Sequence, residues 1–85
     1  MQDAETRLWR AVVLQALTDI AAGEANHRDE AIHWMSSKDF IEVCDAADAQ
    51  PHAVRQLAWD LSATPDRQRR IWMLSRIRER LAIYA

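Results

Sequence analysis

The chain of 85 residues contains few residues that break or cross-link a polypeptide: one Cys, one Gly and two Pro. A single Cys excludes an internal disulfide framework and a Cys-based zinc site. So little Gly and Pro argues against a β-sandwich or small barrel, which needs a turn about every 8–12 residues. No apolar run is long enough to span a membrane, and the N-terminal stretch MQDAETRLWR lacks the apolar segment of a signal peptide. These absences predict a small, soluble, all-helical protein of the cytoplasm.

The residues that are present suffice for one domain, 1–85. Hydrophobic residues make up 49% of the chain and include four Trp. Apolar side chains recur at helical spacing in five segments, which predicts a bundle of about five short helices. The expected helices are about 3–22, 27–35, 38–47, 51–61 and 65–84. The single core is expected to contain Trp9, Val13, Leu17, Phe40, Val43, Val54, Leu57 and Leu74.

Capping residues mark the expected helix ends. Asp3 is the expected N-cap of the first helix and Gly23 its stop, and Asn26 is expected to cap the second. Ser36 and Asp39 have the spacing of a capping box before the third helix. Pro51 suits the first position of the fourth helix. Thr64 and Pro65 are expected to be the N-cap and first residue of the last helix.

The apolar faces of two helices extend this core. In the first helix, Trp9, Val12, Val13, Ala16, Leu17 and Ile20 lie on one arc. In the last helix, the expected apolar face consists of Ile71, Met73, Leu74, Ile77, Leu81 and Tyr84.

The net charge of −2 conceals an asymmetry between the two halves. Residues 1–50 hold four basic and ten acidic residues, a net charge of −6. Residues 51–85 hold seven Arg and three acidic residues, a net charge of +4. Such asymmetry indicates either a polyanionic or acidic partner for the basic half, or attraction between the halves within a monomer or across a homodimer.

The segment 40–61, FIEVCDAADAQPHAVRQLAWDL, resembles a helix-turn-helix. Cys44 stands at the small position of the first helix, Asp48 at the turn, and Val54 and Leu57 at the later apolar positions. The turn position is usually Gly because its backbone is left-handed, and Asp tolerates that region better than most residues. A plain helical hairpin packed in a bundle uses the same apolar spacing.

The resemblance implies a helix-turn-helix at about 38–61, with a recognition helix from Pro51 to Leu61. The side chains that would face a DNA major groove or its phosphates are Gln50, His52, Ala53, Arg55, Gln56 and Trp59. Arg and Gln are the residue types that read guanine and adenine edges. Asp45 and Asp48 lie near the expected path of the phosphates and count against DNA contact.

The last helix supplies the second signal, a basic surface. Arg69, Arg76 and Arg80 fall within roughly 40° of helical arc, beside Trp72 and Ile83. They span about 16 Å along the helix and could follow a phosphate backbone. The alternatives are a solvated face, a dimer seam or a surface for an acidic protein.

The sequence gives little support for catalysis or metal binding. His27, His33 and His52 lack the spacing of metal ligands, and no Gly-rich phosphate loop is present. Cys44 lies on an apolar stripe, which is typical of an inert core thiol. We therefore expect no enzyme activity, cofactor or metal.

Three sequence patterns together resemble a group of small, largely uncharacterised proteins. They are W-R-x-V-x-x-Q-A-x-x-D at 9–19, A-x-x-W-x-x-S at 31–37, and D-F-x-x-V-C-x-x-A with P-x-x-V-R at 39–55. The group is encoded in alphaproteobacterial prophages and phage-like gene transfer agents. Its usual form has Ala-Gly before the turn and Asp before the Pro, where this chain has Ala47-Asp48 and Gln50.

The resemblance implies a setting, namely a phage-like element, more than an activity. The sequence thus predicts a DNA-binding accessory or regulatory protein for double-stranded DNA, with a role in transcription regulation, packaging or recombination. The alternative is a protein-protein interaction module that binds an acidic partner, such as a component of the transcription machinery. Neither reading involves a membrane.

Overall fold

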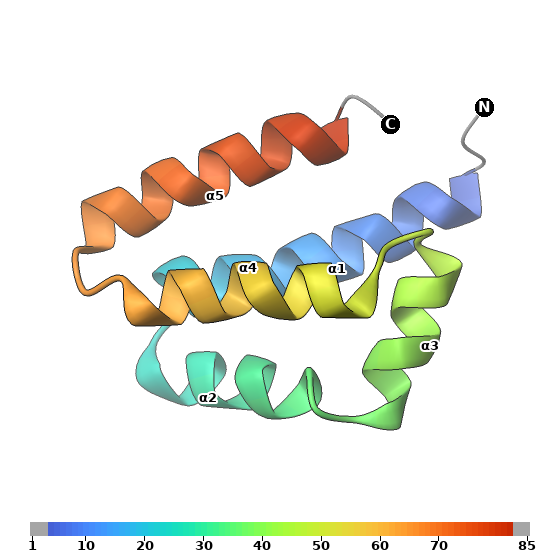
Figure 1. The fold of residues 1–85 in the computed structure, drawn as a ribbon, viewed down its shortest axis with the longest axis horizontal. Coiled ribbons are helices and arrows are strands. Elements are labelled where there is room, and N and C mark those ends of the chain that lie inside the picture. Colours follow the sequence, from blue (N-terminus) through green and yellow to red (C-terminus); the bar gives the residue numbers. More distant parts are fainter. Residues whose placement is uncertain (1–3, 83–85) are drawn as a thin grey trace.

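Five helices and no strand make up residues 4–82, the part of the chain that the computed structural model describes, with side chains through residue 80. They are α1 (Ala4–Ala22), α2 (Ala25–Trp34), α3 (Lys38–Ala46), α4 (Pro51–Ala63) and α5 (Arg67–Ala82). Helix α1 packs against each of the other four. Figure 1 shows α1 and α4 in the middle, α5 along one edge, and α2 and α3 towards the opposite edge. The predicted all-α bundle of five helices is confirmed.

The predicted core is largely confirmed. Six of its eight members are buried: Val13, Leu17, Phe40, Val43, Val54 and Leu74. Trp9 and Leu57 are partly buried and pack against them. Two residues expected on the apolar faces, Val12 and Ile71, are 36% and 38% exposed.

The exposure of Val12 and Ile71 has a geometric cause. Val12 borders a shallow groove where α2 presents the small side chain of Ala31. Helix α5 packs mainly against α1, so the strip that it buries is narrower than its apolar arc. The expectations for Asp3, Leu81, Ile83 and Tyr84 fall outside the described side chains.

The turn at Asp48 has the left-handed backbone that the helix-turn-helix spacing predicts. Its φ is 54°, and Asp48 is the one non-Gly residue with positive φ in residues 4–82. The Ala49 N–H donates to the Cys44 carbonyl at 2.9 Å and the Asp48 N–H to the Asp45 carbonyl at 3.1 Å. This pair of bonds is the Schellman motif, which satisfies the last carbonyls of α3. The chain can then reverse into Pro51, the first residue of α4, as predicted.

Gly23 ends α1, also as predicted, but for reasons of space. A Cβ at this position would lie 2.5 Å from the Asp19 carbonyl oxygen, too close for any side chain without a backbone shift. Its own N–H donates to that carbonyl at 2.9 Å. Helix α2 then begins at Ala25 after Glu24, so the predicted Asn26 cap is wrong. The chain is already helical at Asn26, which leaves its side chain inside the first turn.

The predicted capping box at Ser36 is wrong by one residue. Ser37 is the N-cap of α3, and its Oγ accepts a hydrogen bond from the Phe40 N–H at 3.2 Å. Asp39 does not reach back to the cap. Its Oδ2 instead accepts a hydrogen bond from the Trp34 indole at 2.9 Å. Trp34 in turn meets the Phe40 ring edge to face, with 5.3 Å between centroids.

The predicted start of the last helix at Thr64 and Pro65 is also wrong. Thr64 is the C-cap of α4, because its hydroxyl donates to the Asp60 carbonyl at 2.8 Å instead of accepting from the next helix. Asp66 takes the capping role, since its Oδ1 accepts from the Gln68 N–H at 3.1 Å. Helix α5 accordingly begins at Arg67.

Arg70 joins the ends of two helices. Its Nε donates to the carbonyl of Ala21 in the last turn of α1 at 2.9 Å. Its Nη1 donates to the carbonyls of Thr64 and Pro65, each at 2.8 Å. Carbonyls at a helix C-terminus lack partners within the helix and carry partial negative charge, so a guanidinium satisfies both needs. Arg70 therefore locks α5 onto α1 and onto the loop before it.

Arg10 and Arg55 act in the same way at the C-terminal ends of α3 and α2. The Arg10 Nε donates to the carbonyl of Ala47, the C-cap of α3, at 2.9 Å. The Arg55 Nε donates to the carbonyl of Met35, the C-cap of α2, at 2.9 Å. Helices α1 to α4 thus each receive an arginine from another helix at their C-terminal end.

Candidate nucleic-acid interface

Helix α4 buries one side and presents the other to solvent. Val54, Ala58 and Leu61 face the core. The six residues predicted to face DNA from this region are all exposed: Gln50, His52, Ala53, Arg55, Gln56 and Trp59. This division follows from the helical period, which places the buried positions on one side of the helix axis and the exposed positions on the other. The structure therefore brings the predicted α4 contacts onto one outward face.

Gln50 and Gln56 differ in the hydrogen bonds that their side chains already make. Gln50 is the N-cap of α4 but makes no side-chain cap hydrogen bond. The Gln56 Nε2 donates to the Asp60 carboxylate at 3.1 Å, one turn along an exposed surface. Such a surface bond is weak and can be exchanged for another acceptor.

Arg55 combines an exposed position with structural contacts. Besides its bond to Met35, its guanidinium carbon lies 5.0 Å from the centroid of the Phe40 ring. These contacts leave its Nη atoms as the donors available to a ligand. They also fix the direction of the side chain, which reduces the entropy lost when it binds. The sequence predicted the ligand contact and missed the two structural ones.

Helix α5 presents a basic face. Arg69, Arg76 and Arg80 are all exposed, as predicted. Trp72 lies between them with 57% of its surface exposed. The guanidinium carbons of Arg69 and Arg76 lie 6.0 and 5.8 Å from the Trp72 ring centroid. Arg76 also lies 3.9 Å from Glu79 across an exposed pair, which is worth little in solvent.

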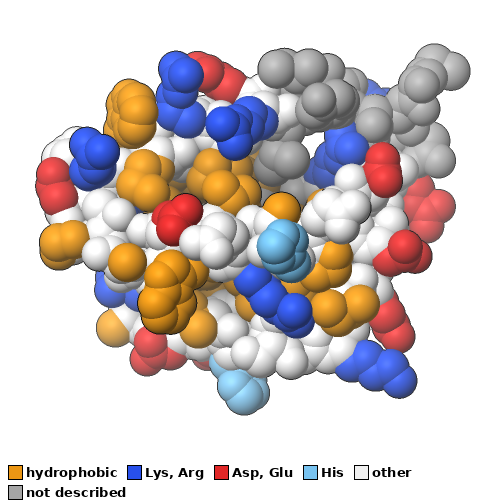
Figure 2. Space-filling model, viewed as in Figure 1, with side chains coloured by type: hydrophobic (Ala, Val, Ile, Leu, Met, Phe, Trp, Pro, Cys, Tyr) orange, Lys and Arg blue, Asp and Glu red, His pale blue; other side chains and the backbone are white. Residues whose placement is uncertain are grey.

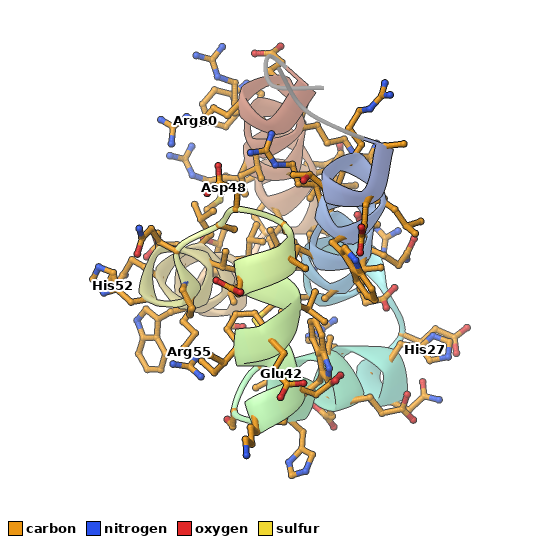
Figure 3. The ribbon with its side chains drawn as sticks, turned by 90° about the vertical axis from the view of Figure 1, so that its right-hand side faces the viewer. His27, Glu42, Asp48, His52, Arg55 and Arg80 are labelled. Atoms are coloured by element: carbon orange, nitrogen blue, oxygen red, sulfur yellow. The ribbon has the colours of Figure 1, made fainter. Side chains whose placement is uncertain are left out.

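The outward face of α4 and the basic face of α5 lie on the same side of the molecule. In Figure 3, Arg80, Asp48, His52 and Arg55 follow one another down one side, whereas Glu42 and His27 lie elsewhere. Figure 2 shows this side face on, with Lys and Arg side chains gathered over α5 at the top. The predicted residues of α4 and α5 could therefore meet one ligand.

Asp48 is the acidic residue in this row. Its side chain is 85% exposed and its carboxylate lies 4.0 Å from the Arg10 Nη2. Arg10, by contrast, has only 11% of its side chain exposed. Asp48 thus places a negative charge beside the outward face of α4 and weakens the attraction of any polyanion, as the sequence indicated.

The charge of the chain separates by helix. Helix α5 carries six arginines and one glutamate, a net charge of +5. Helices α2 and α3 together carry two basic and five acidic residues, a net charge of −3. Because α5 lies along the edge opposite α2 and α3, the molecule has a basic and an acidic end (Figure 1). A polyanion would be oriented towards α5.

An apolar groove adjoins the α4 face. It has a volume of ≈ 170 Å³ and runs between the end of α2 and α4, lined by Ile32, Met35, Ser36, Arg55, Ala58, Trp59 and Ser62. Trp59 is 71% exposed and Ile32 40%. Arg55 is its one charged lining residue. The sequence grouped Trp59 with the DNA contacts but gave no sign of this groove, because Ile32 and Trp59 come from helices distant in the chain.

Other reactive groups are dispersed or buried. Cys44 is fully buried, and this burial raises the pKa of its thiol above the ordinary 9.0, while the charge of Arg55 opposes the shift. Within residues 4–82 no three His, Cys, Asp or Glu side chains gather in a way that could hold a metal ion. Over the same range, no helix has the length and apolar character needed to cross a membrane.

Comparisons with protein-family models, with curated proteins and with solved structures found no match to this chain.

Proposed function

We propose that the protein binds double-stranded DNA through the outward face of α4 and the exposed arginines of α5. The observation that carries the proposal is the position of His52, Arg55 and Arg80 on one side of the molecule, spanning both helices (Figure 3). The left-handed turn at Asp48 adds support, because it sets α4 apart from α3 as an exposed helix. The polar outward face of α4 and the basic face of α5 together fit a ligand as long as a duplex.

The roles of the two helices differ. Helix α4 enters the major groove, where Gln50, His52, Arg55 and Gln56 approach base edges. Helix α5 lies along the backbone, where Arg69, Arg76 and Arg80 contact phosphates over about 16 Å. The proposed setting is the genome of a phage-like element in the cytoplasm, with an accessory or regulatory role in transcription, packaging or recombination.

The test separates phosphate contacts from base contacts by their salt and sequence dependence. Binding of a labelled random-sequence duplex is measured by fluorescence anisotropy at several salt concentrations. We expect the wild type to release about three or more counterions, and Arg76→Ala to reduce this number by about one. Lys38→Ala is the matched control, because Lys38 lies at the opposite end of α3 from the Asp48 turn.

Base contacts require a preferred sequence, selected from a random duplex pool. On that site Arg55→Ala should weaken binding by about 1–3 kcal/mol, with a much smaller effect on random duplex. A general folding defect would weaken both equally, so the difference isolates the base contact. If no duplex binds at low salt, the proposal is wrong.

A second candidate function rests on the apolar groove beside Trp59. Trp is one of the residue types that contribute most of the binding energy in protein interfaces, and here an exposed Trp lines a groove. With Arg55 as its one charged lining residue, the groove fits an apolar side chain next to a carboxylate. The protein would then be an interaction module for an acidic partner, such as a component of the transcription machinery. Failure of DNA binding would favour this function.

A further inference from the structure

Trp72 occupies a position that neither the core nor the proposed duplex contacts explain. Its indole is 57% exposed on α5, while the neighbouring Leu74 and Ile77 are buried. Two guanidinium groups, from Arg69 and Arg76, lie within 6.0 Å of its ring centroid. An indole held at the surface among cations has no packing role that requires its size.

The spacing along α5 sets these three side chains in a row. Arg69 and Arg76 are seven residues apart, which is two helical turns or about 10 Å. Trp72 lies between them, three residues from one and four from the other, on the same face. We define Arg69, Trp72 and Arg76 as the Trp72 face. The face offers a positive charge, an aromatic surface and a second positive charge along the helix. Both guanidinium groups lie over the indole ring, so a base that stacks there displaces a guanidinium towards the neighbouring phosphate.

This arrangement matches the chemistry of an unpaired nucleotide strand. Each base offers a flat π surface that stacks on an aromatic ring, and the phosphates on either side carry negative charge. A paired base cannot use the indole, because both of its faces are already stacked within the duplex. Phosphates alone would need only the arginines.

We propose that the Trp72 face binds an unpaired nucleotide, with the base stacked on the indole and the adjacent phosphates on Arg69 and Arg76. This inference deepens the proposed DNA-binding function and rests on it. Helix α4 and the arginines of α5 contact the duplex as proposed above. Where a base is unpaired at an end, gap or opened segment, that base stacks on Trp72 and its flanking phosphates stay on Arg69 and Arg76. The preferred ligand is then a duplex that carries a single-stranded extension.

The test compares two strands that have the same phosphates and differ only in their bases. A labelled oligothymidine and an abasic strand of equal length are titrated with the full chain by fluorescence anisotropy. Stacking of one base predicts that the oligothymidine binds about 5- to 150-fold more tightly. Trp72→Leu keeps an apolar side chain but has no π surface, so it should abolish this difference. Trp72→Phe should retain part of it.

Two controls assign the effect to the Trp72 face. Leu8→Ala removes another strongly exposed apolar side chain, on α1, and should leave the ratio of the two affinities unchanged. Arg69→Ala should weaken binding of both strands to a similar degree. Far-UV circular dichroism of each variant checks that the helices are intact.

The outcomes distinguish this inference from the proposed function. Equal affinity of the wild type for both strands overturns the stacking role, even where duplex binding persists. A difference that survives in Trp72→Leu also overturns it. If neither the strands nor the duplex bind, the proposed function fails together with the inference.

Discussion

Replacement of Arg70 by Ala should cost more stability than any other single change to a basic residue on α5. The side chain is half-buried and makes three hydrogen bonds to backbone carbonyls. Ala21 is fully buried, so its carbonyl would lose a partner where solvent access is poor, at about 1–3 kcal/mol. The carbonyls of Thr64 and Pro65 lie in a more exposed loop and would together add about 1 kcal/mol. The total is about 2–4 kcal/mol.

Thermal and urea unfolding, followed by circular dichroism, measure this loss. For a domain of this size the melting temperature should fall by about 8–30 °C. Arg69→Ala is the matched control, because it removes the same charge from the adjacent exposed position. It should change the free energy of unfolding by no more than about 0.5 kcal/mol. Equal effects of the two substitutions would refute the role of Arg70 in joining the helix ends.

Three further predictions concern the turn, the core and the buried thiol. Asp48→Gly removes a side chain at φ 54° and a negative charge from the proposed interface, so it should keep the urea midpoint and strengthen binding to random duplex. Asp48→Val should lower the free energy of unfolding by about 1 kcal/mol or more, because a β-branched residue disfavours a left-handed backbone. Val54 is buried and lines an apolar cavity of ≈ 130 Å³, so Val54→Ala should cost about 1–3 kcal/mol, and an unchanged midpoint would mean that the register of α4 is wrong. Burial raises the pKa of the Cys44 thiol, so the unfolded chain ionises this thiol at a lower pH than the folded chain does. The free energy of unfolding therefore falls as the pH rises above the pKa of the unfolded thiol. In urea melts between pH values of about 8 and 10, the wild type should lose more stability than Cys44→Ala.

Much of the local structure could be predicted from the sequence because its causes are local. The apolar residues of α3, with Phe40, Val43 and Cys44 at helical spacing, are all buried as expected. The left-handed turn at Asp48 and the start of α4 at Pro51 follow from short-range sterics. These features depend on neighbours within a few residues, which the sequence displays directly.

The helix ends between these features were less predictable. Ser36 and Ser37 are chemically alike, but the Ser36 N–H still donates to the His33 carbonyl in the turn after α2, and Ser37 has the extended backbone of the N-cap of α3. Thr64 could serve either the end of α4 or the start of α5, and its bond to Asp60 decided for α4. Where two adjacent residues can perform the same task, the packing of the helices selects one of them.

The division of the arginines was decided by the tertiary structure alone. By sequence, Arg69 and Arg70 are adjacent members of one basic run, yet Arg69 is exposed and Arg70 bonds to Ala21, 49 residues away. Its partners are backbone carbonyls, which every residue carries and which therefore leave no mark in the sequence. Amino-acid type determined where the positive charges lie along the chain. Only the folded arrangement of helix ends determined which of them hold the fold together and which remain exposed.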